Sequence, residues 1–251
     1  MLELFSILLT NGKTTKTKTM IFTILYNNYR VINRSLTKLR ETNTLNLPIV
    51  ALDNHYPTLT KAYKTRLKKK FNLTILDAGE NLGLSGGYNY IIEQYPELKH
   101  AILYDCDSNP ETKGWDKSLM DTIKHPKVAY LSLMFDNAKR EMEERGFNPW
   151  LCGEHVIWKP KEACQQSISC VDLTYLRSIG GMQEPKKYYG GLESCMFKFW
   201  NEQNQIGYID GVYEKQMHKD DDTDPRYKEY KWKYAHQGYD KSFDEYLKET
   251  K

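Results

Sequence analysis

Short apolar runs alternate with helical patterns along the first half of the chain, and this alternation restricts the fold more than any other feature. Strands that alternate with amphipathic helices are typical of a mostly parallel sheet. Apolar residues recur at helical spacing between the first two runs, at Val31, Ile32, Leu36 and Leu39. The sequence therefore predicts an α/β fold with strands at residues 20–26, 47–53, 73–78, 101–105 and 128–135.

Further helices are predicted at residues 60–71 and from Gly87 onward. The periodicity weakens from Arg145 to Pro160 and resumes as a strand and a helix over residues 167–181. We find no internal repeat and no low-complexity linker. The sequence therefore predicts one main domain at residues 20–218, with an N-terminal appendage at 1–19 and a C-terminal extension at 219–251.

The composition excludes several classes of protein. Hydrophobic residues make up 40% of the 251 positions and charged residues 27%, with a mean hydropathy of -0.70, which is typical of neither a membrane bundle nor a disordered tail. The 36 basic and 33 acidic residues leave a net charge of +3, too small to require nucleic acid or an anionic membrane as partner. The composition predicts a globular domain with a core of ordinary size.

Two further features bear on localisation. The five cysteines are odd in number and include no C-x-x-C pair, which argues against a disulfide framework and a zinc site. The apolar run Leu4–Leu9 is too short to span a bilayer and lacks the flanks of a signal peptide. We expect no transmembrane segment and a cytoplasmic protein, with peripheral attachment to a membrane left open.

Polar residues follow several of the predicted strands. Asn27, Asp53, the loop Gly79–Gly87 and the pair Asp105 and Asp107 each come after a different strand. In open parallel sheets, ligands bind beyond the carboxyl ends of the strands. We therefore expect these residues to gather along one edge of the sheet, where they would form a binding site.

Asp105 and Asp107 can point the same way if the chain stays extended through Cys106. Paired carboxylates repel each other, and a hard cation such as Mg²⁺ or Mn²⁺ relieves that repulsion while it binds phosphate oxygens. A solvated turn at the strand end explains an isolated pair of this kind equally well.

The glycines of the loop, Gly83, Gly86 and Gly87, permit the backbone to approach a ligand closely. Neither a dinucleotide fingerprint nor a Walker A motif is present, because the spacing, the position and a Gly-Lys-Ser/Thr triplet are missing. A tight turn with close helix packing is the structural alternative to ligand contact.

In their order, these motifs resemble glycosyltransferase family 2 on a GT-A fold. The matching segments read YNNY, VALDN, ENLGLSGGYN, LYDCD and GGLE, followed by a distant histidine, and they cover residues 20–218. The resemblance implies a Rossmann-like GT-A sandwich with a mostly parallel central sheet. It also implies a hexosyltransferase that moves a sugar from a nucleoside-diphosphate sugar, UDP-linked, to an acceptor hydroxyl on a glycan.

The resemblance also assigns roles to particular residues. Asp53 matches the acid that contacts the nucleobase, and Asp105 and Asp107 match a D-x-D motif that holds the diphosphate through Mn²⁺ or Mg²⁺. His218 matches a histidine that completes the metal coordination. The residues implied in donor binding are Asn27, Asp53, Asn81, Gly83, Gly86, Asn89 and Asp105.

Glu193 matches the acid that takes the proton from the acceptor hydroxyl. Here Ser194 stands where the family carries a second acid, so the stereochemistry of transfer stays open. Glu193 could instead orient sugar hydroxyls, or it could be a solvated glutamate at a helix N-terminus.

Several alternatives follow from other residues. The basic run Lys64–Lys70 and the aromatic, basic segment 226–236 suit a phosphate backbone, so a phage-like DNA glycosyltransferase acting on a modified base is one alternative. Ser194 fits a non-catalytic nucleotide-sugar-binding protein, and a nucleotidyltransferase would also pair carboxylates with a metal. Aromatic residues on the expected acceptor side suit sugar stacking or a core equally well, at Trp115, Trp150, Trp158, Tyr188 and Tyr189.

Overall fold

A computed structural model describes residues 19–135, 142–144, 146–159, 167–182, 205–216, 224–235 and 241–250. The strands are β1 (Thr19–Leu25), β2 (Ile49–Asp53), β3 (Leu73–Asp77), β4 (His100–Asp105), β5 (Ser108–Pro110), β6 (Val128–Phe135), β7 (Asn148–Cys152), β8 (His155–Lys159), β9 (Ile168–Asp172) and β10 (Gln205–Gln216). The helices are α1 (Tyr29–Thr42), α2 (Lys61–Phe71), α3 (Gly83–Glu93), α4 (Trp115–Ile123), α6 (Leu173–Ser178), α8 (Pro225–Tyr230) and α9 (Phe243–Glu249), with a π-helical turn η1 (Lys231–Ala235) after α8.

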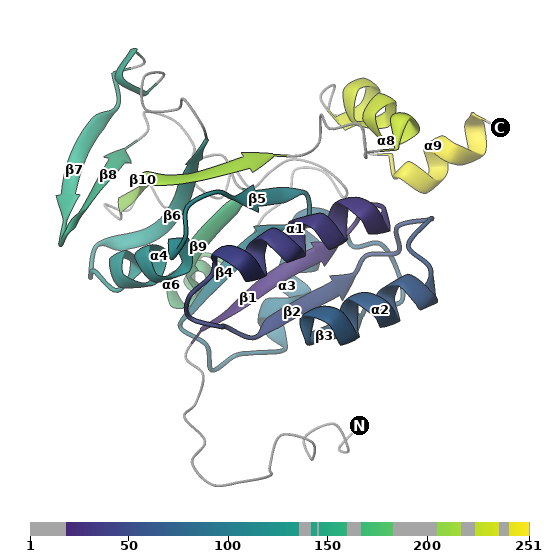
Figure 1. The fold of residues 1–251 in the computed structure, drawn as a ribbon, viewed down its shortest axis with the longest axis horizontal. Coiled ribbons are helices and arrows are strands. Elements are labelled where there is room, and N and C mark those ends of the chain that lie inside the picture. The colour runs from purple at the N-terminus through teal and green to yellow at the C-terminus, as the bar shows by residue number, and fades with distance from the viewer. Residues whose placement is uncertain are drawn as a thin grey trace, which may run out of the picture.

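All ten of these strands form one sheet in the order β3-β2-β1-β4-β9-β6-β10-β8-β7, with β5 paired to β10 (Figure 1). Strands β3, β2, β1 and β4 run parallel, and β6 pairs with β10 in parallel. Strand β9 lies antiparallel between β4 and β6. The predicted α/β fold with a mostly parallel central sheet is confirmed, and the five predicted strands begin and end within two residues of the observed ones.

Two apolar layers cover the sheet. Along β1, Ile21 and Leu25 pack into the layer beneath α1, α2 and α4, whereas Phe22 and Ile24 pack into the layer beneath α3 and α6. Figure 1 shows α1 and α2 in front of the sheet and α3 behind it. Because β1 is buried on both faces, it is apolar at almost every position, as expected for a central parallel strand.

Helix α1 forms because its apolar residues share one face and its first turn is capped. The Asn28 Oδ1 accepts a hydrogen bond from the Val31 backbone N–H at 3.1 Å. Helix α2 begins after the cap Thr60 and ends at Asn72, whose φ of 52° is left-handed. Most of the basic run of α2 is exposed, which agrees with the solvated-face interpretation of Lys64–Lys70.

The prediction that a loop extends to Gly87 is wrong, because α3 already begins at Gly83. Packing explains why a glycine stands inside this helix. A Cβ at Gly87 would approach the Ile24 Cδ1 to 2.8 Å and the Leu52 Cδ2 to 3.0 Å. Gly87 therefore lets α3 lie close against β1 and β2, which is the structural alternative considered for this glycine.

A hairpin and a helix were not predicted. The weakly patterned segment 145–160 contains the hairpin β7–β8, in which Trp150 pairs with Ile157. Helix α4 begins after Gly114, whose φ of 80° is left-handed, and buries Trp115 completely. The indole N–H of Trp115 donates to the Thr42 hydroxyl at 3.1 Å, so this tryptophan belongs to the core and not to an acceptor surface.

The C-terminal segment folds back onto the sheet. Helices α8 and α9 lie at the end toward which the β1 and β2 arrows point (Figure 1). Tyr227 and Phe243 pack against Tyr56, with ring centroids 5.5 Å away in both cases. The segment thus covers residues that follow the strands, and it buries Tyr227, Tyr230, Phe243 and Tyr246, whereas its Trp232 is exposed.

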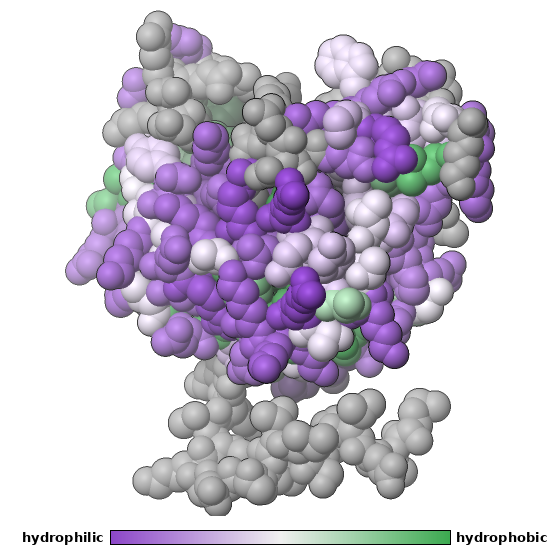
Figure 2. All heavy atoms as spheres, turned by 45° about the vertical axis from the view of Figure 1, so that its right-hand side comes forward, coloured by the Kyte–Doolittle hydropathy of each residue, from purple (hydrophilic) through white to green (hydrophobic). Residues whose placement is uncertain are grey.

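The surface of the described residues is largely hydrophilic on the face that Figure 2 shows. Large hydrophobic side chains exposed within the described ranges are Leu45, Leu151 and Trp232. In the same ranges, Cys106, Cys152 and Cys170 are buried free thiols. No helix found there has both the length and the apolar character needed to cross a membrane. Of the predicted appendage, only Thr19 is described, and it is the first residue of β1.

Candidate functional site

The parallel strands end together at one edge of the sheet. In register, Leu25 of β1 lies beside Asp53 of β2, and Asp53 lies beside Asp77 of β3. Asp105 pairs with Ile24 at the end of β4. The strand-end argument therefore brings Asp53 and Asp105 to a common edge, and it adds Asp77, which the sequence analysis did not name.

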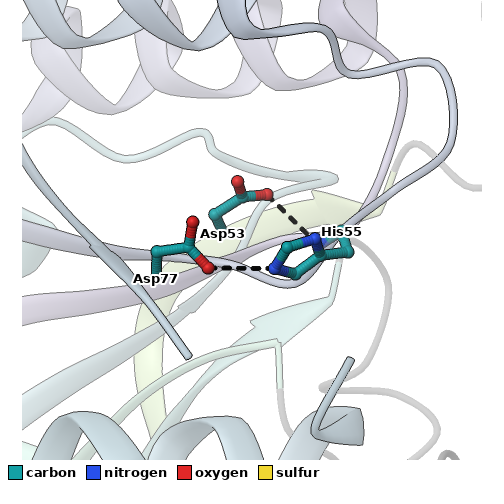
Figure 3. Close-up of side chains that lie close together, drawn as sticks. All are labelled: Asp53, His55 and Asp77. Atoms are coloured by element: carbon teal, nitrogen blue, oxygen red, sulfur yellow. Dashed lines mark hydrogen bonds and ion pairs between the residues drawn. The ribbon is translucent and has the colours of Figure 1, made fainter. Parts of the chain in front are cut away.

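The first group at this edge, here called the outer cluster, consists of Asp53, His55 and Asp77 (Figure 3). The His55 Nε2 lies 2.9 Å from the Asp77 Oδ1, and the His55 backbone N–H donates to the Asp53 Oδ1 at 3.2 Å. His55 has a φ of 59°, so a left-handed turn directs its side chain back toward β3. One ligand atom from each residue lies within 4.8 Å of the others, close enough to hold a metal ion.

The charges of the outer cluster are already partly balanced. The Lys64 Nζ forms an ion pair with the Asp53 Oδ2, and Asp53 is buried. The Gly79 backbone N–H and His55 both hydrogen-bond Asp77 and hold the pKa of that carboxyl below its usual value. The polar groups of the outer cluster therefore already have hydrogen-bond or ion-pair partners, and some of them are exposed. Such groups suit a neutral ligand that forms hydrogen bonds.

Asn54 joins the outer cluster to the start of α3. Its Oδ1 accepts from the Leu82 backbone N–H at 2.9 Å, and its Nδ2 donates to the Gly83 carbonyl at 3.2 Å. Asn81 accepts from the Gly83 backbone N–H at 2.9 Å. The predicted donor residues Asn81 and Gly83 therefore lie beside the end of β2, where Asn54 holds the start of α3.

The second group, here called the inner cluster, consists of Asp105, Asp107 and Glu214. Burial and the charge of Asp107 raise the pKa of Asp105 well above its usual value. Burial, then Asp105 and Asp107, do the same for Glu214. Glu214 belongs to β10, which pairs with β5 so that Glu214 lies opposite Pro110. The three carboxyl groups therefore act on one another electrostatically from strands far apart in the sequence.

The inner cluster is less well satisfied than the outer one. The Tyr88 hydroxyl donates to the Asp105 Oδ1 at 3.3 Å, and the Ile168 backbone N–H donates to the Glu214 Oε1 at 3.4 Å. The Glu214 Oε2 is buried and has no hydrogen-bond partner. Buried carboxylates without a compensating charge are costly, and oxygen ligands are those that Mg²⁺ and Mn²⁺ prefer. This donor set fits a divalent cation.

The remaining predicted residues lie elsewhere. Asn27 is buried at the end of β1, where its Oδ1 accepts from the Asn28 backbone N–H at 2.8 Å. Gly86 and Asn89 lie within α3, and Asn89 exchanges two hydrogen bonds of 2.8 Å with the Met182 backbone. That pairing ties α3 to the chain after α6. Glu193 and His218 lie outside the described residues.

Of the aromatic residues predicted on the acceptor side, some lie in described parts of the chain and others do not. Trp158 is buried like Trp115, and Trp150 is partly buried with its ring edge-on to His125 at 5.4 Å. Tyr188 and Tyr189 fall in a part of the chain that is not described. The structure therefore assigns two of these side chains to the core.

An open, mostly parallel sheet with carboxylates beyond its strand ends is typical of α/β folds that bind ligands at this edge. The sequence matches no protein-family model and no curated protein. Solved structures do match. A mannosyltransferase from Pyrobaculum calidifontis in complex with GDP-Man and Mn²⁺ aligns with a TM-score of 0.65 and 12% identity over 82% of this chain.

Two other solved structures give the same result. GalNAc-T7 with UDP, GalNAc and Mn²⁺ aligns with a TM-score of 0.61 and 9% identity over 79% of this chain. The S. aureus protein TarS, residues 1–349 in complex with UDP-GlcNAc, gives 0.56 and 16% over 78%. The chain spans 58%, 43% and 58% of the three matched chains, in the order given. The protein has the GT-A fold of nucleotide-sugar glycosyltransferases, as the sequence resemblance predicted.

Proposed function

We propose that the protein is a metal-dependent hexosyltransferase that moves a sugar from a nucleoside-diphosphate sugar, UDP-linked, to a hydroxyl of a glycan acceptor. The observation that carries this proposal is the inner cluster at the carboxyl edge of a GT-A sheet, in which the buried Glu214 has one unpartnered oxygen and interacts electrostatically with Asp105 and Asp107. Three matched structures support it. One holds GDP-Man and Mn²⁺, one holds UDP, GalNAc and Mn²⁺, and one holds UDP-GlcNAc.

The nucleoside binds at the outer cluster in this proposal. Asp53 accepts hydrogen bonds from the nucleobase while Lys64 keeps its charge balanced. Asn27, Asn81 and the start of α3 complete the wall, with Gly83 supplying a close backbone contact. The sequence resemblance also implies Gly86 and Asn89 in donor binding. We keep Gly86 in this wall and assign Asn89 to packing, because its side-chain amide donates a hydrogen bond to the Met182 carbonyl.

The diphosphate binds at the inner cluster. Asp105, Asp107 and His218 are the proposed metal ligands, and we add the buried Glu214 as a neighbouring carboxylate. A divalent cation bound there supplies electrostatic stabilisation of the negative charge on the departing diphosphate. The desolvation that raises the pKa of Asp105 would also strengthen this interaction.

Glu193 is the proposed base that accepts the proton of the acceptor hydroxyl. Replacement of Glu193 by Gln should lower the transfer rate far more than the donor affinity, because the amide keeps its shape and cannot take a proton. Equal transfer by the variant would place the base elsewhere. The anomeric configuration of the product then distinguishes inversion from retention.

Thermal stabilisation tests the donor site directly. A ligand that binds only the folded state raises the apparent stability by RT ln(1 + [L]/Kd), so even a weak donor is detectable at high concentration. We expect UDP-sugars or GDP-sugars to raise the melting temperature in the presence of Mn²⁺ and to lose most of that effect in EDTA. No stabilisation by any nucleotide sugar would overturn the proposal.

Three further assays distinguish the alternative functions. Binding without transfer or hydrolysis would favour a non-catalytic nucleotide-sugar-binding protein. Release of pyrophosphate from a nucleoside triphosphate and a sugar phosphate would favour a nucleotidyltransferase. Strongly salt-dependent binding of DNA that carries a modified base would favour the DNA glycosyltransferase.

A further inference from the structure

The C-terminal segment brings a lysine to the inner cluster. Lys231, the first residue of η1, places its Nζ 3.5 Å from the Asp107 Oδ2. Their side chains are only 21% and 15% exposed, so this is not an ordinary surface ion pair. The two residues are separated by 124 positions, and the predicted catalytic domain ended before Lys231.

Lys231 is held at this place by an aromatic cluster. Its Nζ lies 5.4 Å from the centroid of the Tyr227 ring, a cation–π contact. The Tyr227 ring in turn lies 6.0 Å from Tyr26 and 5.5 Å from Tyr56. Tyr26 directly follows β1 and Tyr56 comes soon after β2, so the segment is attached to the same strand ends that form the candidate site.

A second layer of rings fixes Tyr227. Tyr230 stacks on it with centroids 5.9 Å apart, and Phe243 of α9 packs edge-on at 5.1 Å. The Tyr230 hydroxyl donates to the Lys241 carbonyl at 2.5 Å, which joins α8 to the start of α9. The buried aromatic side chains of residues 224–235 and 241–250 therefore build a support for Lys231.

The charges around Lys231 indicate what it can bind. Its Nζ pairs with Asp107, and its positive charge also acts on Asp105, whose pKa it lowers against the larger opposing effect of burial. A divalent cation compensates the carboxylates, and a diphosphate that joins that cation adds new negative charge beside Asp107. An ammonium group on a flexible stem is a suitable point charge for phosphate oxygens. Its position next to Asp107 is within reach of such a diphosphate.

We propose that Lys231 binds the diphosphate of the nucleotide-sugar donor and stabilises it as the leaving group. The C-terminal segment is then part of the donor site and not an appendage to it. This inference rests on the proposed glycosyltransferase function, and it adds a residue that the sequence motifs do not assign.

The test compares ligands that differ by one phosphate. Calorimetry in Mn²⁺ measures the Kd of UDP, GDP, UMP and GMP for the wild type and for Lys231→Met, with Lys231→Arg as the conservative variant. We expect Lys231→Met to bind the diphosphate about tenfold or more weakly and the monophosphate within about twofold of the wild type. Lys231→Arg should restore most of the lost affinity. The matched control is Lys233→Met, which removes an exposed lysine from the same turn and should change neither value.

Two further measurements separate the causes of failure. Mn²⁺ affinity without nucleotide should be unchanged or tighter in Lys231→Met, because a positive charge beside the carboxylates is removed. Equal losses for diphosphate and monophosphate, or no loss for either, would overturn the role of Lys231 while the wild type still binds UDP or GDP. If the wild type itself binds no nucleotide in Mn²⁺, the proposed function fails first. A melting temperature without ligand identifies a variant that has not folded.

Discussion

The outer and inner clusters both consist of carboxyl groups at the ends of parallel strands, yet their environments differ. In the outer cluster, Asp77 is exposed and hydrogen-bonded, and its pKa lies below the usual value. In the inner cluster, Glu214 is buried, and the pKa values of Asp105 and Glu214 lie well above their usual values because of desolvation and the neighbouring carboxylates. The two clusters are therefore suited to different parts of one ligand.

The difference is one of charge compensation. Lys64 balances Asp53, and His55 bonds Asp77, so the outer cluster can accept hydrogen bonds without needing another ion. Lys231 alone faces the inner cluster from the described part of the C-terminal segment, and one oxygen of Glu214 has no partner. The inner cluster therefore suits a cation better than the outer one does, which agrees with the proposal of a nucleoside at the outer cluster and a metal-bound diphosphate at the inner one.

Helix α3 connects the two clusters. Its first residue, Gly83, is held by Asn54 beside the outer cluster, and Tyr88 one turn later donates to Asp105 of the inner cluster. Any shift of α3 therefore moves groups of both clusters together.

The largest effect is expected from Asp107→Ala. Loss of this carboxylate should lower metal-dependent turnover of the donor by at least about a hundredfold, since the metal would no longer be held where the diphosphate departs. The fold should persist because Asp107 lies beyond the end of β4. Initial rates in saturating Mn²⁺ measure the loss, and Asp121→Ala, which removes an exposed carboxylate from α4, is the matched control. Turnover like that of the wild type would remove Asp107 from the metal site.

A smaller but global effect is expected from Gly87→Ala. The added methyl group would meet Ile24 and Leu52 at 2.8 and 3.0 Å, and such overpacking costs about 1–3 kcal/mol of unfolding free energy. Denaturant unfolding measures this cost. Gly86→Ala is the matched control, because the nearest side-chain atom lies 3.5 Å away and alanine favours a helix. If Gly86→Ala weakens donor binding while it keeps or raises stability, the predicted donor contact of Gly86 is supported.

The sequence predicted the parallel half of the sheet because its strands are buried on both faces and read as continuous apolar runs, as in Ile21–Leu25. It did not predict β7 and β8, whose exposed Leu151 and polar neighbours show no such run. It also placed the start of α3 four residues late, because glycine disfavours helices and only the contact of Gly87 with Ile24 explains its presence.

From the sequence, residues of the candidate site could be predicted only where they lie at the end of a predicted strand. Asp53 and Asp105 were found by this argument, and Asp77 could have been, because it ends the third strand as Asp53 ends the second. Glu214 and Lys231 could not be found, since they reach Asp107 through the pairing of β5 with β10 and the docking of α8. Long-range pairing leaves no local pattern in the sequence.

A moderate effect is expected from His55→Ala in the outer cluster. The loss of one hydrogen-bonding group should weaken UDP and UMP by the same factor, about threefold to tenfold, because both carry the nucleoside. Mn²⁺ affinity without nucleotide should not change. Calorimetry of the three ligands makes the measurement. A marked loss of Mn²⁺ affinity would mean that Asp53, His55 and Asp77 hold the metal, which would reverse the assignment of the two clusters.

The smallest effect is a pH dependence of the metal-free protein. A carboxyl whose pKa is raised in the folded state binds protons more readily there than in the unfolded chain, so folding is favoured at low pH and loses stability as pH rises above about 4.5, the ordinary value for glutamate. In EDTA, the melting temperature should therefore fall between pH 5.5 and pH 7.5, and Glu214→Gln should reduce that fall because an amide does not titrate. The outer cluster predicts the opposite sign, since the lowered pKa of Asp77 contributes stability that is lost only as pH falls below the usual aspartate range. If Glu214→Gln leaves the slope unchanged, the inner cluster is compensated in solution, and the need for a cation there no longer follows from its burial.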